Sequence, residues 1–369
     1  MSERIAFVFP GQGSQAVGMG ADIAAASPAA RAVFSLADAA VGFPLSELCF
    51  NGPEEALRET INTQPAIVAT SLALLAALQE AAGAGLTPHP QGRGGPRHYT
   101  AAEGEVPAPI LDAPLRPAYV AGHSVGEYAA LAASGALPIG DALRLVRERG
   151  RLMHAEGQAC PSGMAAVLGM DADALSAVCA EATARAEAEL AKTGAATAAG
   201  VHPGAGKVVL ANDNAPGQIV ISGEHHALDL AMALARERGA KRVVPLAVSG
   251  AFHSPVMAPA AEGLARAVAA APLADARVPL VANITAKPIT VAADLRQELA
   301  QQIAAPVQWT RSISRLAEDG VTTFVEIGAG QVLSGLIKRI ARGAATLSVA
   351  AAADVAPVAA QLRARLGVA

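Results

Sequence analysis

Aromatic residues are scarce in this sequence, and neither sign of charge dominates it. Aromatic side chains make up 3% of the 369 residues and hydrophobic side chains 52%, so the core must consist of Ala, Val, Leu and Ile. Such a composition suits helices packed on a parallel sheet. The formal net charge is -4 with both signs interspersed, unlike the broad basic surface of a nucleic-acid-binding protein. We therefore expect an α/β protein without a nucleic-acid partner.

Cysteines and long apolar runs are also few. Cys49, Cys160 and Cys179 are an odd number without metal-type spacing, which indicates buried thiols in a reducing compartment and no metal site. Five apolar residues precede Pro10, fewer than the roughly 7–15 of a signal-peptide core. The longest apolar stretch, residues 66–78, is shorter than the roughly 20 residues that span a bilayer. These shortages predict a cytoplasmic protein that contacts no membrane.

The pattern of apolar residues predicts an α/β core in which loops follow strands. Residues 5–9 are typical of a buried strand that leads into a glycine-rich loop, and residues 64–82 of a buried helix. A second strand over residues 118–121 precedes a sharp turn and a helix. Residues 85–117, rich in Pro and Gly, predict an irregular insertion.

A smaller domain is predicted within this core. Residues 162–248 show the element order β-α-β-β-α-β, which is typical of a ferredoxin-like unit. Residues 183–207 extend its first crossover with Ala and Gly. We therefore predict a large α/β-hydrolase-like domain with a mainly parallel sheet over residues 1–161 and 249–369, and an inserted ferredoxin-like subdomain over residues 162–248.

The segment Gly122-His123-Ser124-Val125-Gly126 fits the G-x-S-x-G motif of a nucleophile elbow. Its glycines allow a turn so tight that the serine oxygen projects from the sheet edge. In a chain with 35 glycines the pattern alone could arise by chance. Because it stands between a predicted strand and a predicted helix, Ser124 is the candidate nucleophile.

A serine hydroxyl needs a base within hydrogen-bond reach, and histidine has a suitable pKa. His253 follows a predicted strand and lies between small residues and Pro255, which fix the backbone. It is the candidate base, with a backbone-bonded loop histidine as the alternative. Surface, solvated or capping roles are expected for His89, His98, His154, His202, His225 and His226.

Two backbone amides must hold the oxyanion that forms when a serine attacks a carbonyl. The Val125 amide, directly after the serine, is one candidate, and Gln12 in the first glycine-rich loop is the other. An ordinary strand-to-helix turn is the alternative for this loop. It lacks the Gly-Lys-Ser/Thr of a phosphate-binding loop.

Arg149 is the candidate for an anion site. It lies on a different helix face from Arg144 and Arg151, since only spacings of three or four share a face. A buried arginine is costly unless an anion pairs with it, and a substrate carboxylate held by two hydrogen bonds would be such a partner. A solvated helix face is the alternative.

Together these residues resemble the malonyl-CoA:acyl-carrier-protein transacylases and the acyltransferase domains of polyketide synthases. The resemblance covers nearly the whole chain outside the two insertions. Its motifs, in the order of that family, are Phe9-Pro10-Gly11-Gln12-Gly13-Ser14-Gln15, Gly122-His123-Ser124-Val125-Gly126-Glu127-Tyr128, Arg149-Gly150 with Met153, Asn212-Asp213-Asn214, Pro216-Gly217-Gln218, Gly250-Ala251-Phe252-His253, Pro306-Val307-Gln308-Trp309 and Glu326-Ile327-Gly328.

The resemblance implies roles for single residues. Ser124 becomes acylated, His253 acts as general base and acid, and Arg149 grips the distal carboxylate of a malonyl group. The backbone carbonyl of Gln308 is expected to orient His253 in place of a triad carboxylate.

Further expectations concern the substrate and the partner. The amides of Gln12 and Val125 are expected to form the oxyanion hole, and His123 and Phe252 to contact the substrate. Val125 and the pair Ala251-Phe252 resemble the malonyl-selecting pattern. Lys338 and Arg339, after Gly335, are candidates for docking the acidic carrier protein, with a solvated helix face as the alternative.

The function implied is ping-pong transfer of malonyl from malonyl-CoA to the phosphopantetheine thiol of acyl carrier protein. The pathway is fatty acid or polyketide synthesis, the protein is expected to be a monomer, and no cofactor is expected to be bound. The rival enzyme is a serine esterase or thioesterase of the α/β-hydrolase class, which would carry its histidine near the C-terminus. The non-enzymatic alternative is an inactive carrier-protein docking subunit.

Overall fold

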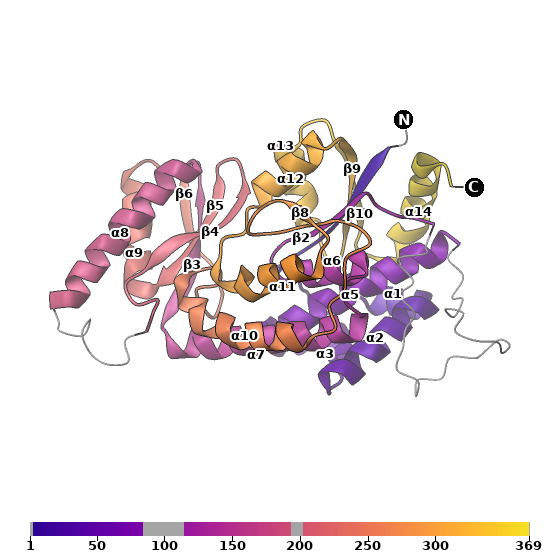
Figure 1. The fold of residues 1–369 in the computed structure, drawn as a ribbon, viewed down its shortest axis with the longest axis horizontal. Helices are drawn as coiled ribbons and strands as arrows, with labels where there is room; N and C mark the ends of the chain where they lie inside the picture. Colours follow the sequence, from indigo (N-terminus) through magenta and orange to yellow (C-terminus); the bar gives the residue numbers. More distant parts are fainter. Residues whose placement is uncertain (1–2, 84–113, 193–201, 369) are drawn as a thin grey trace.

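A six-stranded, mainly parallel sheet forms the centre of the larger part of the molecule (Figure 1). The computed structural model describes residues 3–83, 114–192 and 202–368. The strands, in sheet order β10-β9-β1-β2-β7-β8, are Ala345–Val349, Val321–Ile327, Arg4–Phe9, Tyr119–Gly122, Leu280–Val281 and Pro288–Ile289. All neighbouring pairs are parallel except β7 with β8. The predicted α/β fold with a mainly parallel sheet is confirmed.

Strand β1 shows why this sheet needs helices on both faces. Ile5, Phe7 and Phe9 belong to the apolar cluster on one face, and Ala6 and Val8 to the cluster on the other. Side chains of a strand alternate between faces, so a strand covered on both sides has an uninterrupted apolar sequence.

The helices fall into two layers on the two faces (Figure 1). The layer on the Ile5 face contains α1 (Ala21–Ala26), α2 (Pro28–Val41), α3 (Leu45–Asn51), α4 (Glu54–Arg58), α5 (Thr60–Ala81), α6 (Gly126–Ser134), α7 (Ile139–Ala159), α10 (Ala258–Ala270), α11 (Ala292–Gln301) and α14 (Ala352–Leu366). The layer on the Ala6 face contains α12 (Trp309–Glu318) and α13 (Val332–Ile340). Two short 3-10 helices, η2 (Pro255–Met257) and η3 (Gln302–Ala304), lie near the sheet edge that carries the site described below.

A smaller antiparallel sheet lies to the left in Figure 1. Its strands, in sheet order β4-β5-β3-β6, are Val208–Ala215, Gln218–Glu224, Ser162–Leu168 and Arg242–Pro245, and helices α8 (Ala172–Lys192) and α9 (His225–Glu237) pack on one face. The order of elements along the chain is the predicted β-α-β-β-α-β. Strand β6 ends at Pro245, three residues before the predicted end of the subdomain at residue 248.

The second face of the small sheet turns toward the large one. Met164 and Val220 on this face belong to the core of the larger part. Strand β4 is also joined to the segment before α12, because Asp213 N donates to the Val307 carbonyl (2.9 Å) and Val307 N to the Ala211 carbonyl (2.8 Å). These contacts fix the two sheets relative to each other and leave a cleft between them.

The buried parts of this fold include the three cysteines and helix α5. All three cysteines are free and buried, as predicted. Helix α5 is long and apolar enough for a membrane span, yet 89% of its most apolar window is buried, as in a core helix. Most of the predicted insertion 85–117 and the middle of the crossover 183–207, with His89 and His98, lie outside the described residues.

Candidate active site

Ser124 lies in a sharp turn between β2 and α6. Its φ of 51° is in the left-handed region, which a non-glycine residue seldom adopts. The glycines on either side are required by close approach: a Cβ on Gly122 would lie 2.0 Å from the carbonyl carbon of Gly126, and one on Gly126 would lie 2.2 Å from the Phe9 carbonyl oxygen. The turn therefore has the strained geometry that the G-x-S-x-G motif predicts.

His253 faces Ser124 across the cleft. Its Nε2 is 2.7 Å from the Ser124 Oγ, and its Nδ1 is 3.0 Å from the carbonyl oxygens of both Gln302 and Ala305. Because a carbonyl can only accept, Nδ1 carries the proton and Nε2 is free to accept the serine proton. Burial, and then the positive charge of Arg149, lower the pKa of His253 to about 3, so the ring is neutral at pH 7.

The prediction for Gln308 is wrong. Its carbonyl accepts hydrogen bonds from Ser312 N (2.9 Å) and Ser312 Oγ (3.0 Å), because Gln308 is the N-cap of α12. The carbonyls that face the His253 ring belong to Gln302 and Ala305, at the ends of η3.

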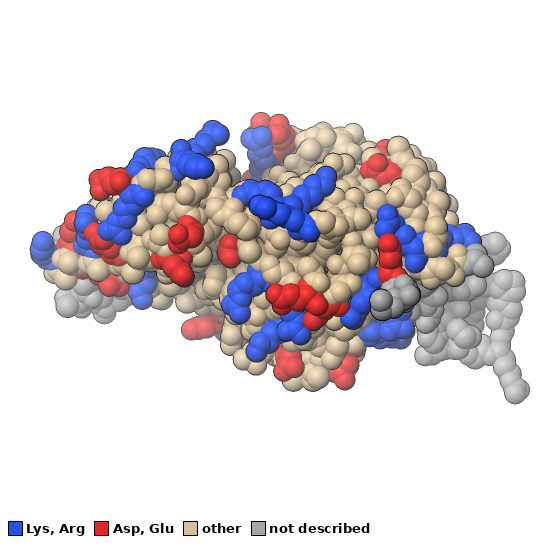
Figure 2. All heavy atoms as spheres, turned by 90° about the horizontal axis from the view of Figure 1, so that it is seen from above, with Lys and Arg blue, Asp and Glu red and all other residues tan. Residues whose placement is uncertain are grey.

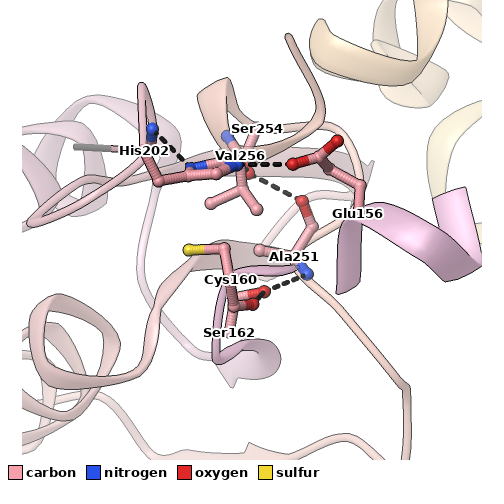
Figure 3. A network of polar contacts seen from close by, with 8 residues as sticks. Glu156, Cys160, Ser162, His202, Ala251, Ser254 and Val256 are labelled. Carbon is pink, nitrogen blue, oxygen red and sulfur yellow. Dashed lines mark hydrogen bonds and ion pairs between the residues drawn. The ribbon is translucent and has the colours of Figure 1, made fainter. Parts of the chain in front are cut away.

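Hydroxyl groups hold the loop that carries His253 (Figure 3). Ser162 Oγ accepts from Ala251 N (3.1 Å) and donates to the Cys160 carbonyl (2.8 Å). Ser254 Oγ donates to the Ala251 carbonyl (2.7 Å). These bonds help to hold His253 at its positive φ of 59°.

His202 lies beside this loop and differs from its predicted solvated or capping role. Its ring bonds to the carboxylate of Glu156 near the end of α7, and its exposed side-chain fraction is 19% (Figure 3). His202 thus connects the small-sheet segment to α7. His154 lies within α7 and is half-buried rather than at the surface.

Arg149 is buried in α7, with 1% of its surface exposed. Its Nη1 donates to Gln64 Oε1 (2.7 Å), and its Nη2 donates to Gln302 Oε1 (2.8 Å) and Ser124 Oγ (3.1 Å). Over the described ranges of the chain, no carboxylate forms an ion pair with it. Burial lowers the pKa of Arg149, which is the cost of an unpaired cation in the interior. An anion in the cleft would offset that cost.

The two candidate oxyanion amides belong to Gln12, in the loop after β1, and Val125, directly before α6. In the hydrogen-bond network of the described residues, neither main-chain N–H donates to a protein acceptor. The Gln12 side chain donates to Thr60 Oγ1 (3.2 Å), which fixes the loop against α5. Both amides are therefore available to a ligand.

The cleft has a volume of about 480 Å³ and is lined from both sheets. Its polar end is formed by Gln12, His123, Ser124, Arg149 and His253, and its wall on the small sheet by Met164, Asn212, Asn214 and Val220. Phe252 also lines it. The His123 ring bonds to Asn214 Oδ1 (2.7 Å) and lies edge-on to Trp309, with burial lowering its pKa.

Lys338 and Arg339 do not line this cleft. Both are exposed in the last turn of α13, and Arg339 Nη2 donates to the Pro216 carbonyl (2.6 Å) in the turn between β4 and β5.

Sequence reasoning missed two amide side chains that touch the proposed nucleophile. Asn283 Oδ1 accepts from Ser124 N (2.8 Å), and Gln302 Nε2 donates to the Ser124 carbonyl (2.9 Å). Asn283 lies two residues beyond β7, and a polar residue just past the carboxyl end of a parallel strand is a detectable signal. Gln302 is in a short 3-10 helix without such a signal.

Among the described residues, no cluster of three or more His, Cys, Asp or Glu side chains could hold a metal ion. The expectation that no cofactor is bound stays a prediction.

Comparisons with known proteins agree on one family. The family model described as acyl transferase domain matches residues 6–90, 113–184 and 163–359. The malonyl CoA-acyl carrier protein transacylase of Bacillus subtilis is 42% identical over 346 residues, which cover 94% of this chain and 93% of that protein.

Solved structures of such transacylases are also similar to this chain. The acyl-carrier-protein S-malonyltransferase of Bartonella henselae has a TM-score of 0.81 at 34% identity and covers 97% of this chain and 99% of that one. A malonyl-transacylase solved with its type II polyketide synthase acyl-carrier protein has a TM-score of 0.79 at 33% identity and covers 97% and 99%.

Proposed function

Because the chain belongs to the acyl transferase family, and within it to the malonyl CoA-acyl carrier protein transacylases, we propose that Ser124, His253 and Arg149 carry out its reaction. That reaction moves a malonyl group from malonyl-CoA to an acyl carrier protein. The observation that carries the residue assignment is the buried Arg149, which pairs with no carboxylate in the part of the chain that the structure describes and whose Nη2 lies 3.1 Å from the Ser124 Oγ.

The first half-reaction makes a malonyl-serine. Neutral His253 accepts the Ser124 proton at Nε2 as Oγ forms a bond to the thioester carbon. The carbonyl oxygen becomes an oxyanion and is held by the amides of Gln12 and Val125. The carbon–sulfur bond then breaks, and the proton on Nε2 passes to the sulfur of coenzyme A. His253 returns to its neutral form.

The second half-reaction reverses these steps with a new thiol. The phosphopantetheine thiol of the carrier protein gives its proton to His253 Nε2, and its sulfur attacks the ester carbon. The Ser124 Oγ leaves and takes that proton back. Because the first product leaves before the second substrate reacts, the kinetics are ping-pong.

Arg149 selects an acyl group that carries a carboxylate. The malonyl carboxylate is one methylene beyond the carbonyl that Ser124 attacks, so it falls within reach of a guanidinium in contact with Oγ. Two N–H groups of Arg149 can then hold it in a planar pair. His123, held by Asn214, and Phe252 are the remaining proposed substrate contacts.

The test is intact-protein mass spectrometry after incubation with malonyl-CoA, followed by addition of holo acyl carrier protein. The wild type should gain one malonyl group and lose it to the carrier protein, and Ser124→Ala should gain none. Ser134→Ala, which removes another buried serine in α6, is the matched control and should be labelled like the wild type. Labelling of Ser124→Ala would overturn the assignment.

A serine esterase is disfavoured because backbone carbonyls, and not a carboxylate, face the His253 Nδ1. Rapid hydrolysis of simple esters without a thiol acceptor would support the esterase. An inactive docking subunit would form no acyl-enzyme.

The carrier protein is proposed to dock near the exposed Lys338 and Arg339. Figure 2 shows the molecule from above. Basic side chains gather near the middle of this face, and acidic and basic side chains are mixed over the rest of it. The polyketide synthase complex supports an acyl carrier protein as the partner. The protein is proposed to be cytoplasmic, because its three free thiols suit a reducing compartment. It is also proposed to be a monomer.

The architecture around the cleft is proposed to be an α/β-hydrolase-like domain, residues 1–161 and 249–369, with a ferredoxin-like insertion over residues 162–248. The strand order of the small sheet supports the ferredoxin-like insertion. When its strands are numbered along the chain, they lie in the order 2-3-1-4 across the sheet. Two helices cover one face of that sheet.

A further inference from the structure

A buried carboxylate lies directly behind Ser124. Glu127, on the first turn of α6, has 0% of its surface exposed. Its Oε1 accepts from the main-chain N (3.0 Å) and the Nδ2 (2.9 Å) of Asn283, and its Oε2 accepts from Gln302 Nε2. The mechanism proposed above does not use this group.

Its two partners fix the reacting groups. Asn283 accepts from Ser124 N and donates to the Gly122 carbonyl (2.7 Å), so it holds both sides of the turn. Gln302 donates to the Ser124 carbonyl, accepts from Arg149 Nη2, and presents its own carbonyl to the His253 ring. The Glu127 carboxylate is thus connected to Ser124, His253 and Arg149, in each case through one intervening residue.

We propose that Glu127 is a positioning residue that sets the orientation of both amides, and so aligns Ser124, His253 and Arg149 before substrate binds. The inference rests on the proposed roles of those three residues. It also places the negative charge of Glu127 one residue away from Arg149, because the side-chain amide of Gln302 bonds to both.

The two ends of a side-chain amide have nearly the same shape but opposite hydrogen-bonding roles. An ionised carboxylate only accepts, so it draws the NH₂ ends of Asn283 and Gln302 toward itself. Their oxygens are then left for the donors Ser124 N and Arg149 Nη2. If an N–H group replaced one of the carboxylate oxygens, at least one of these two amides would have to turn around. Its NH₂ end would then face the N–H of Ser124 or Arg149 that it now accepts from.

The local electrostatics act on Glu127 in opposite directions. Burial, and then the charge of Glu298, raise the pKa of Glu127 well above the usual carboxyl range, whereas the three N–H bonds from Asn283 and Gln302 favour its ionised form. The negative charge of Glu127 in turn favours the charged form of Arg149. The position in the first helical turn adds the favourable end of the helix dipole.

The experiment measures single-turnover acylation by malonyl-CoA and by acetyl-CoA in Glu127→Gln, Glu127→Asp and the control Glu326→Gln. Glu326 is also a buried carboxyl with two N–H partners, but they are Leu333 N and Ser334 N of α13. Rates are taken per folded protein, well below the unfolding temperature, so that a stability loss alone does not change them.

Glu127→Gln should slow acylation at saturating substrate about 10–100-fold with both acyl groups, since a misplacement of about 1 Å costs about that factor. The KM for malonyl-CoA should change less than the rate, because Gln64 still holds Arg149. Glu127→Asp keeps the charge but is shorter, so its rate should fall between those of Gln and wild type. It also provides the test if Glu127→Gln fails to fold. The control should acylate at the wild-type rate.

A double-mutant cycle tests the route. In a Gln302→Met background, Glu127→Gln should cost clearly less than in the wild type, because the two changes break one chain of contacts. If the two substitutions slow acylation independently, so that their factors multiply, the proposed route through Gln302 is wrong. A wild-type acylation rate in folded Glu127→Gln, or an equal loss of rate in Glu326→Gln, would overturn the positioning role of Glu127. If the wild type is not acylated at Ser124, the proposed function fails instead, and the two failures are distinct.

Discussion

Replacing Arg149 with methionine should convert a malonyl-selective protein into one that prefers acetyl. The change keeps a long side chain in the buried site and removes only the guanidinium. An acetyl group has a hydrogen where malonyl has the carboxylate, so it has no bond to Arg149 to lose. The measurable quantity is the ratio of kcat/KM for malonyl-CoA to kcat/KM for acetyl-CoA.

The size of the effect follows from the contacts of Arg149. A hydrogen bond to a charged group contributes about 1.5–3 kcal/mol, and the planar pair contains two. Part of this gain is offset because Nη2 already bonds Gln302 and Ser124. A net loss of about 3–4 kcal/mol corresponds to a ratio lower by about 100–1000-fold.

The assay is stopped-flow or quenched acylation with each thioester, with Arg151→Met as the matched control. Arg151 is on the same helix, but its side chain is 54% exposed and pairs with Glu148. The control should keep the wild-type ratio. Equal losses for malonyl and acetyl in Arg149→Met would refute the carboxylate role and would point to a purely structural arginine.

Four shorter predictions rest on the same geometry. Burial and a nearby cation lower the pKa of His253 to about 3. The value of kcat/KM should therefore stay level as the pH falls through 6.5, where an ordinary histidine gains its proton. A kcat/KM that drops to half its maximum near pH 6.5 would contradict this prediction. The unfolded histidine gains its proton below about pH 6.5 and the folded one only near 3, so its contribution to the free energy of unfolding should fall from pH 7 to pH 5 in urea titrations. Gly126→Ala should disrupt folding or acylation, because the new Cβ would lie 2.2 Å from the backbone of β1. Gly335→Ala in α13, where the space around the glycine is open, should leave the Tm unchanged or raise it. The same effect of both substitutions on Tm and acylation would refute the packing argument. Asn283→Ala should slow acylation about 10-fold or more by freeing the Ser124 amide, and an unchanged single-turnover rate would count against it.

Elements with a strong local signal could be predicted from the sequence. Strand β1 and the Ser124 turn follow from an apolar run ended by glycines, and the alternation of strands and helices in residues 162–248 gave the element order of the small sheet. The helices α1 to α4 were not predicted. They are short, at 5 to 14 residues, and the buried face of the longest one contains Ala residues as well as larger apolar side chains.

The site divides in the same way. Ser124, His253 and Arg149 could be proposed because their side chains carry the chemistry, and residue identity is what a sequence records. The partner of the His253 Nδ1 could not, because it is a main-chain carbonyl that every residue has. Only the path of η3 decides that Gln302 and Ala305, and not Gln308, face the ring.

The carbonyl partner of His253 leads to a last prediction about water. A carboxylate behind the ring would stabilise the imidazolium and make the histidine a stronger base, whereas burial and Arg149 make it a weak one. To release malonyl from Ser124, the acceptor must give its proton to that base. A thiol with a pKa of about 8.5 does so far more readily than water with a pKa of about 15.7. The malonyl-enzyme should therefore survive in buffer for many times the turnover time and vanish when holo carrier protein is added, as intact mass spectrometry over time would show. Decay in buffer as fast as transfer to the carrier protein would contradict this prediction.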